Sequence, residues 1–233
     1  MILTVAVILV VSGALLVGAA WGIFGSLPTK VEGLVVAVAG GALLLSAVLE
    51  LIDPATEVTS IFSASVFVLA GAGVFAGLDY LVDERWGSGS GGGLLAAITL
   101  DGIPENLALG VALIGADPLQ VAALSGSILL SNLPEAAGGA KGMASGGRSK
   151  WAVFGLWGAT AVLLSAAALA GNLLLEGAPE AALAWIRCFA AGAVVASLAT
   201  EVFPKAFEEG SYSAGMATSV GLVLALGLHG LSG

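Results

Sequence analysis

Three acidic residues lie inside long apolar stretches of this chain, where an ionised side chain is costly. Asp101 and Glu105 are four residues apart, so on a helix their carboxylates share one face. Ser131 and Asn132 precede Glu135 by four and three residues, which places them on one face as well. Carboxylates this close repel one another unless protons or cations neutralise them. Because oxygen ligands of this kind suit metal ions, these five residues are candidate metal ligands.

Each of the two stretches contains a Pro-Glu pair, Pro104-Glu105 and Pro134-Glu135. A proline has no N–H and its ring crowds the carbonyl four residues earlier, so we expect bent helices with the carbonyls of Leu100 and Leu130 freed. Such backbone survives in a membrane only where it faces protein or water. Protonated acids that merely join helices by hydrogen bonds are the structural alternative. The duplication of the motif favours a functional site.

The composition predicts an all-α polytopic membrane protein. The 233 residues are 58% hydrophobic and 10% charged, with a mean hydropathy of +1.07, whereas soluble domains are about 25% charged. One transmembrane domain, residues 1–233, is expected to contain eight helices. With breaks at Gly, Pro and charge clusters, the spans are predicted at about 2–24, 31–52, 58–82, 94–115, 119–142, 151–175, 181–204 and 213–231.

The basic residues predict the orientation in the membrane. Six of the seven fall in the loops between spans 1–2, 3–4, 5–6 and 7–8, and only Arg187 falls on the other side. The positive-inside rule then places these loops in the cytoplasm and both termini outside, in an inner or plasma membrane. The formal net charge of -9 argues against a nucleic-acid partner. The single cysteine, Cys188, excludes an internal disulfide.

An internal repeat relates spans 2 and 7. Residues Gly41 to Glu50 and Gly192 to Glu201 carry Gly, Ala, Ser and Glu at the same offsets. Since the two spans are expected to run in opposite directions, the repeat is inverted, as in many secondary transporters. Glu50 and Glu201 are expected near the ends of their spans, on a transport path. The other acids, among them Asp79 and Glu32, are expected at interfaces and turns.

Taken together, these motifs resemble the ZIP (Zrt-, Irt-like protein) family of divalent metal transporters. That family carries the pattern His-Asn-x-Pro-Glu-Gly in spans 4 and 5, which correspond here to the segments Asp101–Glu105 and Ser131–Glu135. The resemblance implies an inverted 3+2+3 arrangement in which helices 4 and 5 carry the metal site. It also implies metal ligands at Asp101, Glu105, Ser131, Asn132 and Glu135. The ends of spans 2 and 7, around Glu50 and Glu201, resemble their family counterparts too.

Two departures from the family pattern bear on the transported metal. Asp101 and Ser131 replace histidines, which makes the site all-oxygen, and span 6 lacks the acid that completes a second metal position in many members. Imidazole suits zinc, whereas carboxylates suit harder ions. The expected substrates are divalent cations such as Zn2+, Mn2+, Fe2+ and Cd2+, with a shift in preference from zinc toward Mn2+. No organic cofactor is expected. The resemblance and the small-residue helix faces are compatible with a homodimer.

Three other functions use the same residues. A proton- or organic-ion-coupled carrier would use Asp101, Glu105 and Glu135 as a relay. A non-transporting, metal-sensing relative would fit the missing acid in span 6. An intramembrane enzyme is not expected, because the zinc-hydrolase signature His-Glu-x-x-His is absent and His229 is the only histidine.

Overall fold

The computed structural model describes residues 2–25, 28–86, 91–116 and 121–232, and its regular elements over these ranges are all helical. The elements are α1 (Ile2–Phe24), α2 (Thr29–Ser46), η1 (Ala47–Ile52), α3 (Asp53–Val58), α4 (Ile61–Trp86), α5 (Gly91–Ala112), α6 (Ala122–Ser145), α7 (Lys150–Leu174), α8 (Glu180–Ser197), η2 (Leu198–Val202), α9 (Phe203–Gly210) and α10 (Ser213–Ser232). Each of the eight predicted spans overlaps a long helical segment, so the all-α prediction is confirmed.

Within the residues that the structure describes, six segments are long and apolar enough to cross a membrane: Thr4–Phe24, Thr29–Val58, Ile61–Val82, Lys150–Leu174, Glu180–Gly210 and Ser213–Leu231. The helices α5 and α6 are not among them. These two helices contain the acids, amides and prolines of the candidate site, and such residues lower the hydropathy of a helix. A membrane protein is thus supported by six segments, and the two remaining long helices are those that carry the predicted site.

Two predicted span ends are wrong. The helix that begins at Thr29 continues past Pro54 to Val58, and the helix that begins at Glu180 continues past Pro204 to Gly210. In both cases a π-helical turn, η1 or η2, precedes the proline by a few residues. The widened turn accommodates the proline, which can neither donate a backbone hydrogen bond nor pack tightly against the preceding turn. Pro104 and Pro134 also do not end their helices, since α5 and α6 are α-helical from end to end.

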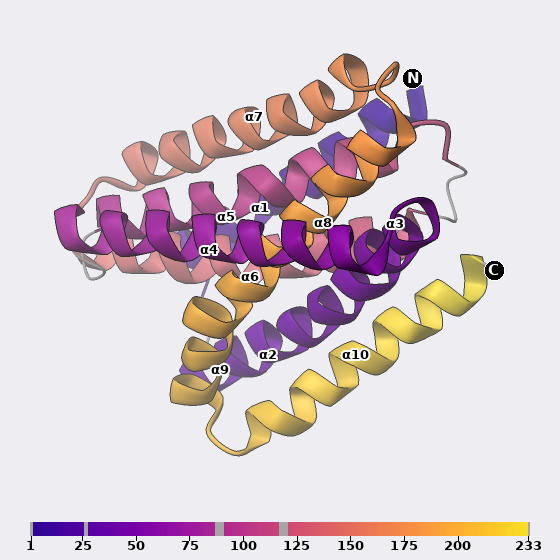
Figure 1. Ribbon diagram of the computed structural model, residues 1–233. Coiled ribbons are helices and arrows are strands. Elements are labelled where there is room, and N and C mark those ends of the chain that lie inside the picture. Colours follow the sequence, from indigo (N-terminus) through magenta and orange to yellow (C-terminus); the bar gives the residue numbers. More distant parts are fainter. Residues whose placement is uncertain (1, 26–27, 87–90, 117–120, 233) are drawn as a thin grey trace.

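The helices pack in two matching sets of pairs. One set joins α1 to α6 and α5 to α7, and the other joins α2 to α10 and α4 to α8. In Figure 1, α2 and α8 run in opposite directions, and both ends of the chain lie on the right of the view. The C-terminal end of α4 and the connections from α6 to α7 and from α9 to α10 lie at the other end, which we call the basic end.

Glycines set the closest helix crossings. A Cβ atom on Gly41 would overlap the carbonyl oxygen of Thr218 on α10, and a Cβ on Gly192 would overlap that of Val68 on α4. Small residues at such crossings let helix backbones approach closely, which favours packing within a membrane. These two glycines are the first residues of the two repeat segments, so the repeat positions equivalent crossings.

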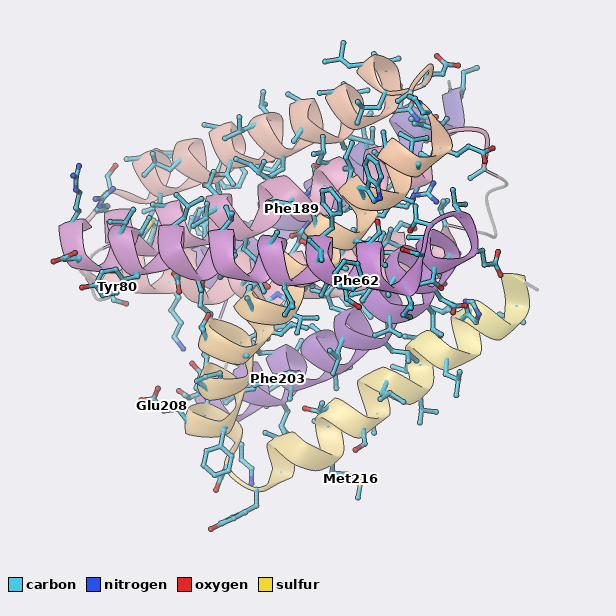
Figure 2. All side chains as sticks on the ribbon, in the orientation of Figure 1. Phe62, Tyr80, Phe189, Phe203, Glu208 and Met216 are labelled. Atoms are coloured by element: carbon cyan, nitrogen blue, oxygen red, sulfur yellow. The ribbon has the colours of Figure 1, made fainter. Side chains whose placement is uncertain are left out.

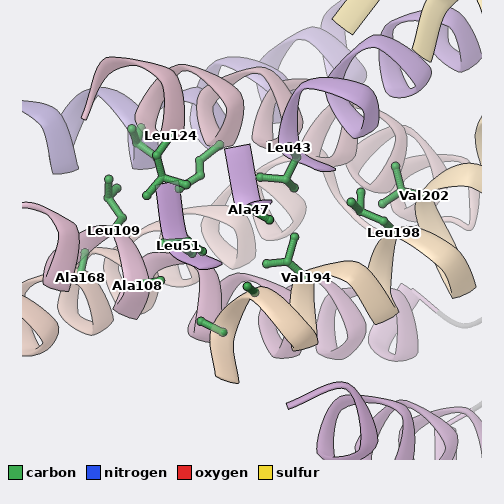
Figure 3. Packing of buried hydrophobic residues seen from close by; sticks show 14 of the residues in the cluster. Leu43, Ala47, Leu51, Ala108, Leu109, Leu124, Ala168, Val194, Leu198 and Val202 are labelled. Carbon is green, nitrogen blue, oxygen red and sulfur yellow. The ribbon is translucent and has the colours of Figure 1, made fainter. Parts of the chain in front are cut away.

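Apolar side chains of the inner helices form the main core. Figure 3 shows Leu43 and Leu51 of the α2–η1 segment beside Leu109 of α5, Leu124 of α6 and Leu198 of η2. The two π-turns therefore lie at the centre of the molecule, next to the helices of the candidate site. This core holds α5 and α6 between the two repeat segments.

Candidate functional site

The structure places the five predicted ligands on two helices in the interior. Asp101 and Glu105 lie on α5, and Ser131, Asn132 and Glu135 lie on α6. Asp101 is 8% exposed and Glu105 is 4% exposed. Electrostatic interactions join Asp101 to Glu135, and Glu105 to both. The three carboxyl groups are thus neighbours in a buried region, as the sequence predicted.

The hydroxyl and amide of α6 have local partners. Ser131 Oγ donates a hydrogen bond to Glu135 Oε1, one turn along the same helix. Asn132 Nδ2 donates to the carbonyl oxygen of Val11 on α1 over 3.1 Å. Ser131 therefore orients the Glu135 carboxylate, while Asn132 connects α6 to α1. Only the oxygen of the Asn132 amide is available as a ligand, because the lone pair of the amide nitrogen is delocalised into the carbonyl group.

Several buried oxygens near the acids have no hydrogen-bond partner. They include Glu105 Oε1, the side-chain oxygen of the neighbouring Asn106, and Glu201 Oε1. Buried acceptors of this kind normally have a partner in the protein, a water or an ion. No three His, Cys, Asp or Glu side chains in the described part of the chain are arranged to hold one metal ion. A cation bound there would have to draw these carboxylates together.

Glu201 of η2 joins these three carboxyl groups, and we call Asp101, Glu105, Glu135 and Glu201 the acidic cluster. The Glu201 carboxyl group hydrogen-bonds with Asp79 of α4 and interacts electrostatically with Asp101 and Glu135. The expectation that Glu201 and Glu50 lie near span ends is wrong, because both residues lie in π-turns within longer helical segments. Such turns are frequent at functional sites. Ser197, one turn before Glu201, faces Asp101, although its Oγ forms no hydrogen bond of standard geometry.

Glu50, the repeat counterpart of Glu201, has different surroundings. Its Oε1 lies 2.8 Å from Nδ1 of His229 on α10. Glu50 also lines a cavity of about 370 Å³ together with Arg187 of α8 and residues at the ends of α5 and α6. Glu50 thus lies at a cavity that none of the four acids of the acidic cluster lines.

Asp79 was expected at a membrane interface, but the sequence contains a second repeat that relates its helix, α4, to α10. Gly71 and Asp79 on α4 each precede Gly221 and His229 on α10 by 150 positions. The two glycines form equivalent close crossings with α8 and α2. Asp79 and His229 are therefore the repeat-related partners of the two π-turn glutamates. Aligning spans 3 and 8 would have shown that Asp79 is the repeat counterpart of His229.

Glu32 lies in the first turn of α2, at a helix end as expected, but nothing in the sequence indicated its burial. Its side chain is only 4% exposed. Its carboxylate lies 3.2 Å from Lys141 Nζ of α6 and 3.3 Å from Lys205 Nζ of α9. These residues lie toward the basic end, where Figure 2 labels Glu208 on α9 and Tyr80 on α4. The pairing with two lysines explains how this carboxylate tolerates burial.

Comparison with known protein families gives no match, and comparison with curated proteins finds no similar sequence. The function is therefore inferred from the chemistry and placement of this chain's own residues.

Proposed function

We propose that the protein is a membrane transporter of divalent metal cations, with eight membrane-spanning helical segments in an inverted 3+2+3 arrangement like that of the ZIP family. The cation would bind between α5 and α6, at Asp101, Glu105 and Glu135, with oxygens of Ser131 and Asn132 completing the site. Because this ligand set contains only oxygen, harder ions such as Mn2+ would be favoured relative to Zn2+.

The acidic cluster is the observation that carries this proposal. In the protein interior, Asp101 and Glu135 interact electrostatically with each other and with both Glu105 and Glu201. Two of their oxygens are buried without a partner. A carboxylate in the membrane interior costs at least about 2.5 kcal/mol on insertion scales. A divalent cation would offset this cost for several carboxylates at once, which a purely structural role would not do.

The packing of the helices supports an inverted arrangement. The pairs α2–α10 and α8–α4 are built on equivalent glycine crossings. The segments α2–η1–α3 and α8–η2–α9 each contain a glutamate in a π-turn. Inverted repeats of this kind allow one half of a transporter to rock against the other around a central site. The cavity lined by Glu50 and Arg187 offers a polar approach from the end where the termini lie.

Metal uptake into proteoliposomes tests the proposal. The purified protein should take up Mn2+, and Glu105→Ala or Glu135→Ala should abolish uptake. Glu57→Gln, an exposed acid on α3 outside the site, is the matched control and should transport normally. Unchanged uptake in both alanine variants would contradict the proposal. Proton movement without any metal uptake by the wild-type protein would indicate the proton-coupled carrier instead.

A strong preference for Zn2+ over Mn2+ in the same vesicles would refute the selectivity predicted from the all-oxygen ligands. The comparison should use equal free concentrations of the two ions. The alanine variants test which residues bind the cation, whereas this comparison tests which metal the site prefers.

A further inference from the structure

We propose that Glu32, Lys141 and Lys205 form a charged gate that closes the acidic cluster from the basic end. The three residues come from α2, α6 and α9 and are far apart in the sequence. Both lysine ammonium groups pair with the single Glu32 carboxylate, at 3.2 Å and 3.3 Å. The gate deepens the proposed function, since it concerns the release of the cation from the same site.

The gate lies between the acidic cluster and the solvent. Lys205 pairs with Glu32 and also interacts electrostatically with Glu135 of the cluster. The lysine side chains are 41% and 36% exposed, whereas that of Glu32 is 4% exposed. The Glu32 carboxylate therefore lies in the interior, and the two lysine ammonium groups lie between it and the solvent. Positive charge at this position repels a divalent cation that would leave Glu135 in this direction.

A further acid on α9 helps to hold both lysines at the gate. Glu209 interacts electrostatically with Lys141, Lys205 and Glu32, and also with its neighbour Glu208. Partly buried ion pairs are stable only when each charge has a partner. Opening this end requires α9 to move away from α6, because Lys205 belongs to α9 and Lys141 to α6. A rocking motion between repeat halves would produce such a separation.

Gly138 provides the space in which the gate closes. It lies on α6, three residues after Glu135, and a Cβ atom there would overlap Glu32 Oε1 and Lys205 Nζ. Both overlapping atoms are ends of flexible side chains, so Gly138→Ala displaces the ion pair and leaves the backbone in place. Gly142, one turn further along α6, has no atom within 4 Å of its added Cβ. Gly142→Ala is therefore a matched control on the same helix.

Thiol labelling measures whether the gate is closed. The background is the full chain with Cys188→Ala, which removes the only cysteine, and Ser131→Cys, which places a thiol one turn beyond Glu135 as seen from the basic end. A membrane-impermeant maleimide is applied from each side of oriented vesicles. Gly138→Ala and Lys205→Met should speed labelling from the basic side about tenfold, as expected for a loss of about 1.4 kcal/mol. Gly142→Ala should label at the background rate.

Equal labelling rates in Gly138→Ala, Lys205→Met and Gly142→Ala would overturn the gate. The readout needs no transported metal, so it is independent of the proposed function. A protein that shows the labelling contrast but takes up no metal would retain the gate and lose the transport proposal. A protein that takes up metal without the contrast would retain transport and lose the gate. Thermal unfolding of each variant verifies that the compared proteins are folded.

Discussion

The distribution of acids separates residues that belong to the candidate site from those that only line its surroundings. Asp101, Glu105 and Glu135 interact with one another in the interior. Glu201 interacts with Asp101 and Glu135 directly and also pairs with Asp79. Glu50 instead pairs with His229 beside a separate cavity. The two glutamates occupy equivalent repeat positions but have partners of opposite character. An acidic partner increases negative charge near a cation, whereas a histidine competes with the cation for the carboxylate.

This difference predicts unequal effects of the two repeat-related glutamates. Glu201→Gln should reduce Mn2+ uptake more strongly than Glu50→Gln, because only Glu201 interacts with the acids on α5 and α6. Initial uptake rates at subsaturating Mn2+ in proteoliposomes provide the comparison. The two variants serve as controls for each other, since both place an amide in a π-turn. A larger loss of uptake in Glu50→Gln would contradict the assignment of Glu201 to the acidic cluster.

At the level of single residues, the sequence predicted correctly that Asp101 and Glu105 share one helix and that Glu135 lies on the next long helix. The i to i+4 spacing is a local property, and the burial of Asp101 and Glu105 follows from the apolar stretch around them. The partners of Glu32 and Asp79 come from helices more than 100 residues away. Such contacts depend on how the helices pack, which composition and spacing do not specify. Glu32 therefore looked like an ordinary acid at a helix start.

At the level of elements, prolines and glycines determine how the helices pass one another. The prediction that Asp53-Pro54 ends a span was wrong because a π-turn absorbs the proline. Nothing in the sequence indicated the π-turn, so Pro54 was interpreted as the end of the membrane span. The glycine repeat was more informative, since Gly41 and Gly192 do lie at equivalent crossings.

A close crossing between α2 and α10 predicts a stability effect at Gly221. Its added Cβ would overlap the carbonyl oxygen of Val38, a backbone atom that cannot move aside. Gly221→Ala should destabilise the protein by about 1–3 kcal/mol, the usual cost of overpacking. Thermal unfolding in detergent measures the difference. Gly227→Ala, on the same helix with no atom within 4 Å of its Cβ, is the control. An equal melting temperature for both variants would show that the crossing is not tight.

At the level of the whole molecule, the number and order of helical segments could be predicted from the hydropathy and from the Gly, Pro and charge clusters that separate the apolar stretches. The pairing of α1 with α6 and of α5 with α7 could not, since apolar helices resemble one another in sequence. Only the internal repeat restricted the choice. The structure places both chain ends at one end of the molecule and the Glu32 ion pairs toward the opposite, basic end.

The arrangement of the ends predicts the topology. Both termini should lie outside and the basic end in the cytoplasm, because six of the seven basic residues lie in or near the four connections assigned there. Tags at each terminus, digested by protease added to intact cells, measure this directly. A tag inserted at Gly147, in the loop between α6 and α7, should be protected. Digestion of the loop tag with protection of both termini would reverse the orientation.

Metal binding should also stabilise the whole fold. A ligand that binds only the native state adds about 2.7 kcal/mol at a concentration one hundred times its dissociation constant. Mn2+ should therefore raise the melting temperature of the wild-type protein. The shift should vanish in the Glu105→Ala, Glu135→Ala double variant and persist in Glu57→Gln. A shift of equal size in the double variant would place the bound metal elsewhere.

The most direct test of the acidic cluster is anomalous scattering from crystals soaked in Mn2+, since it identifies the ion and its ligands in one measurement. The account predicts an anomalous peak between α5 and α6, within bonding distance of carboxylate oxygens from Asp101, Glu105 and Glu135. A peak only beside Glu50 and His229, or no peak in the interior at a concentration that supports uptake, would contradict it.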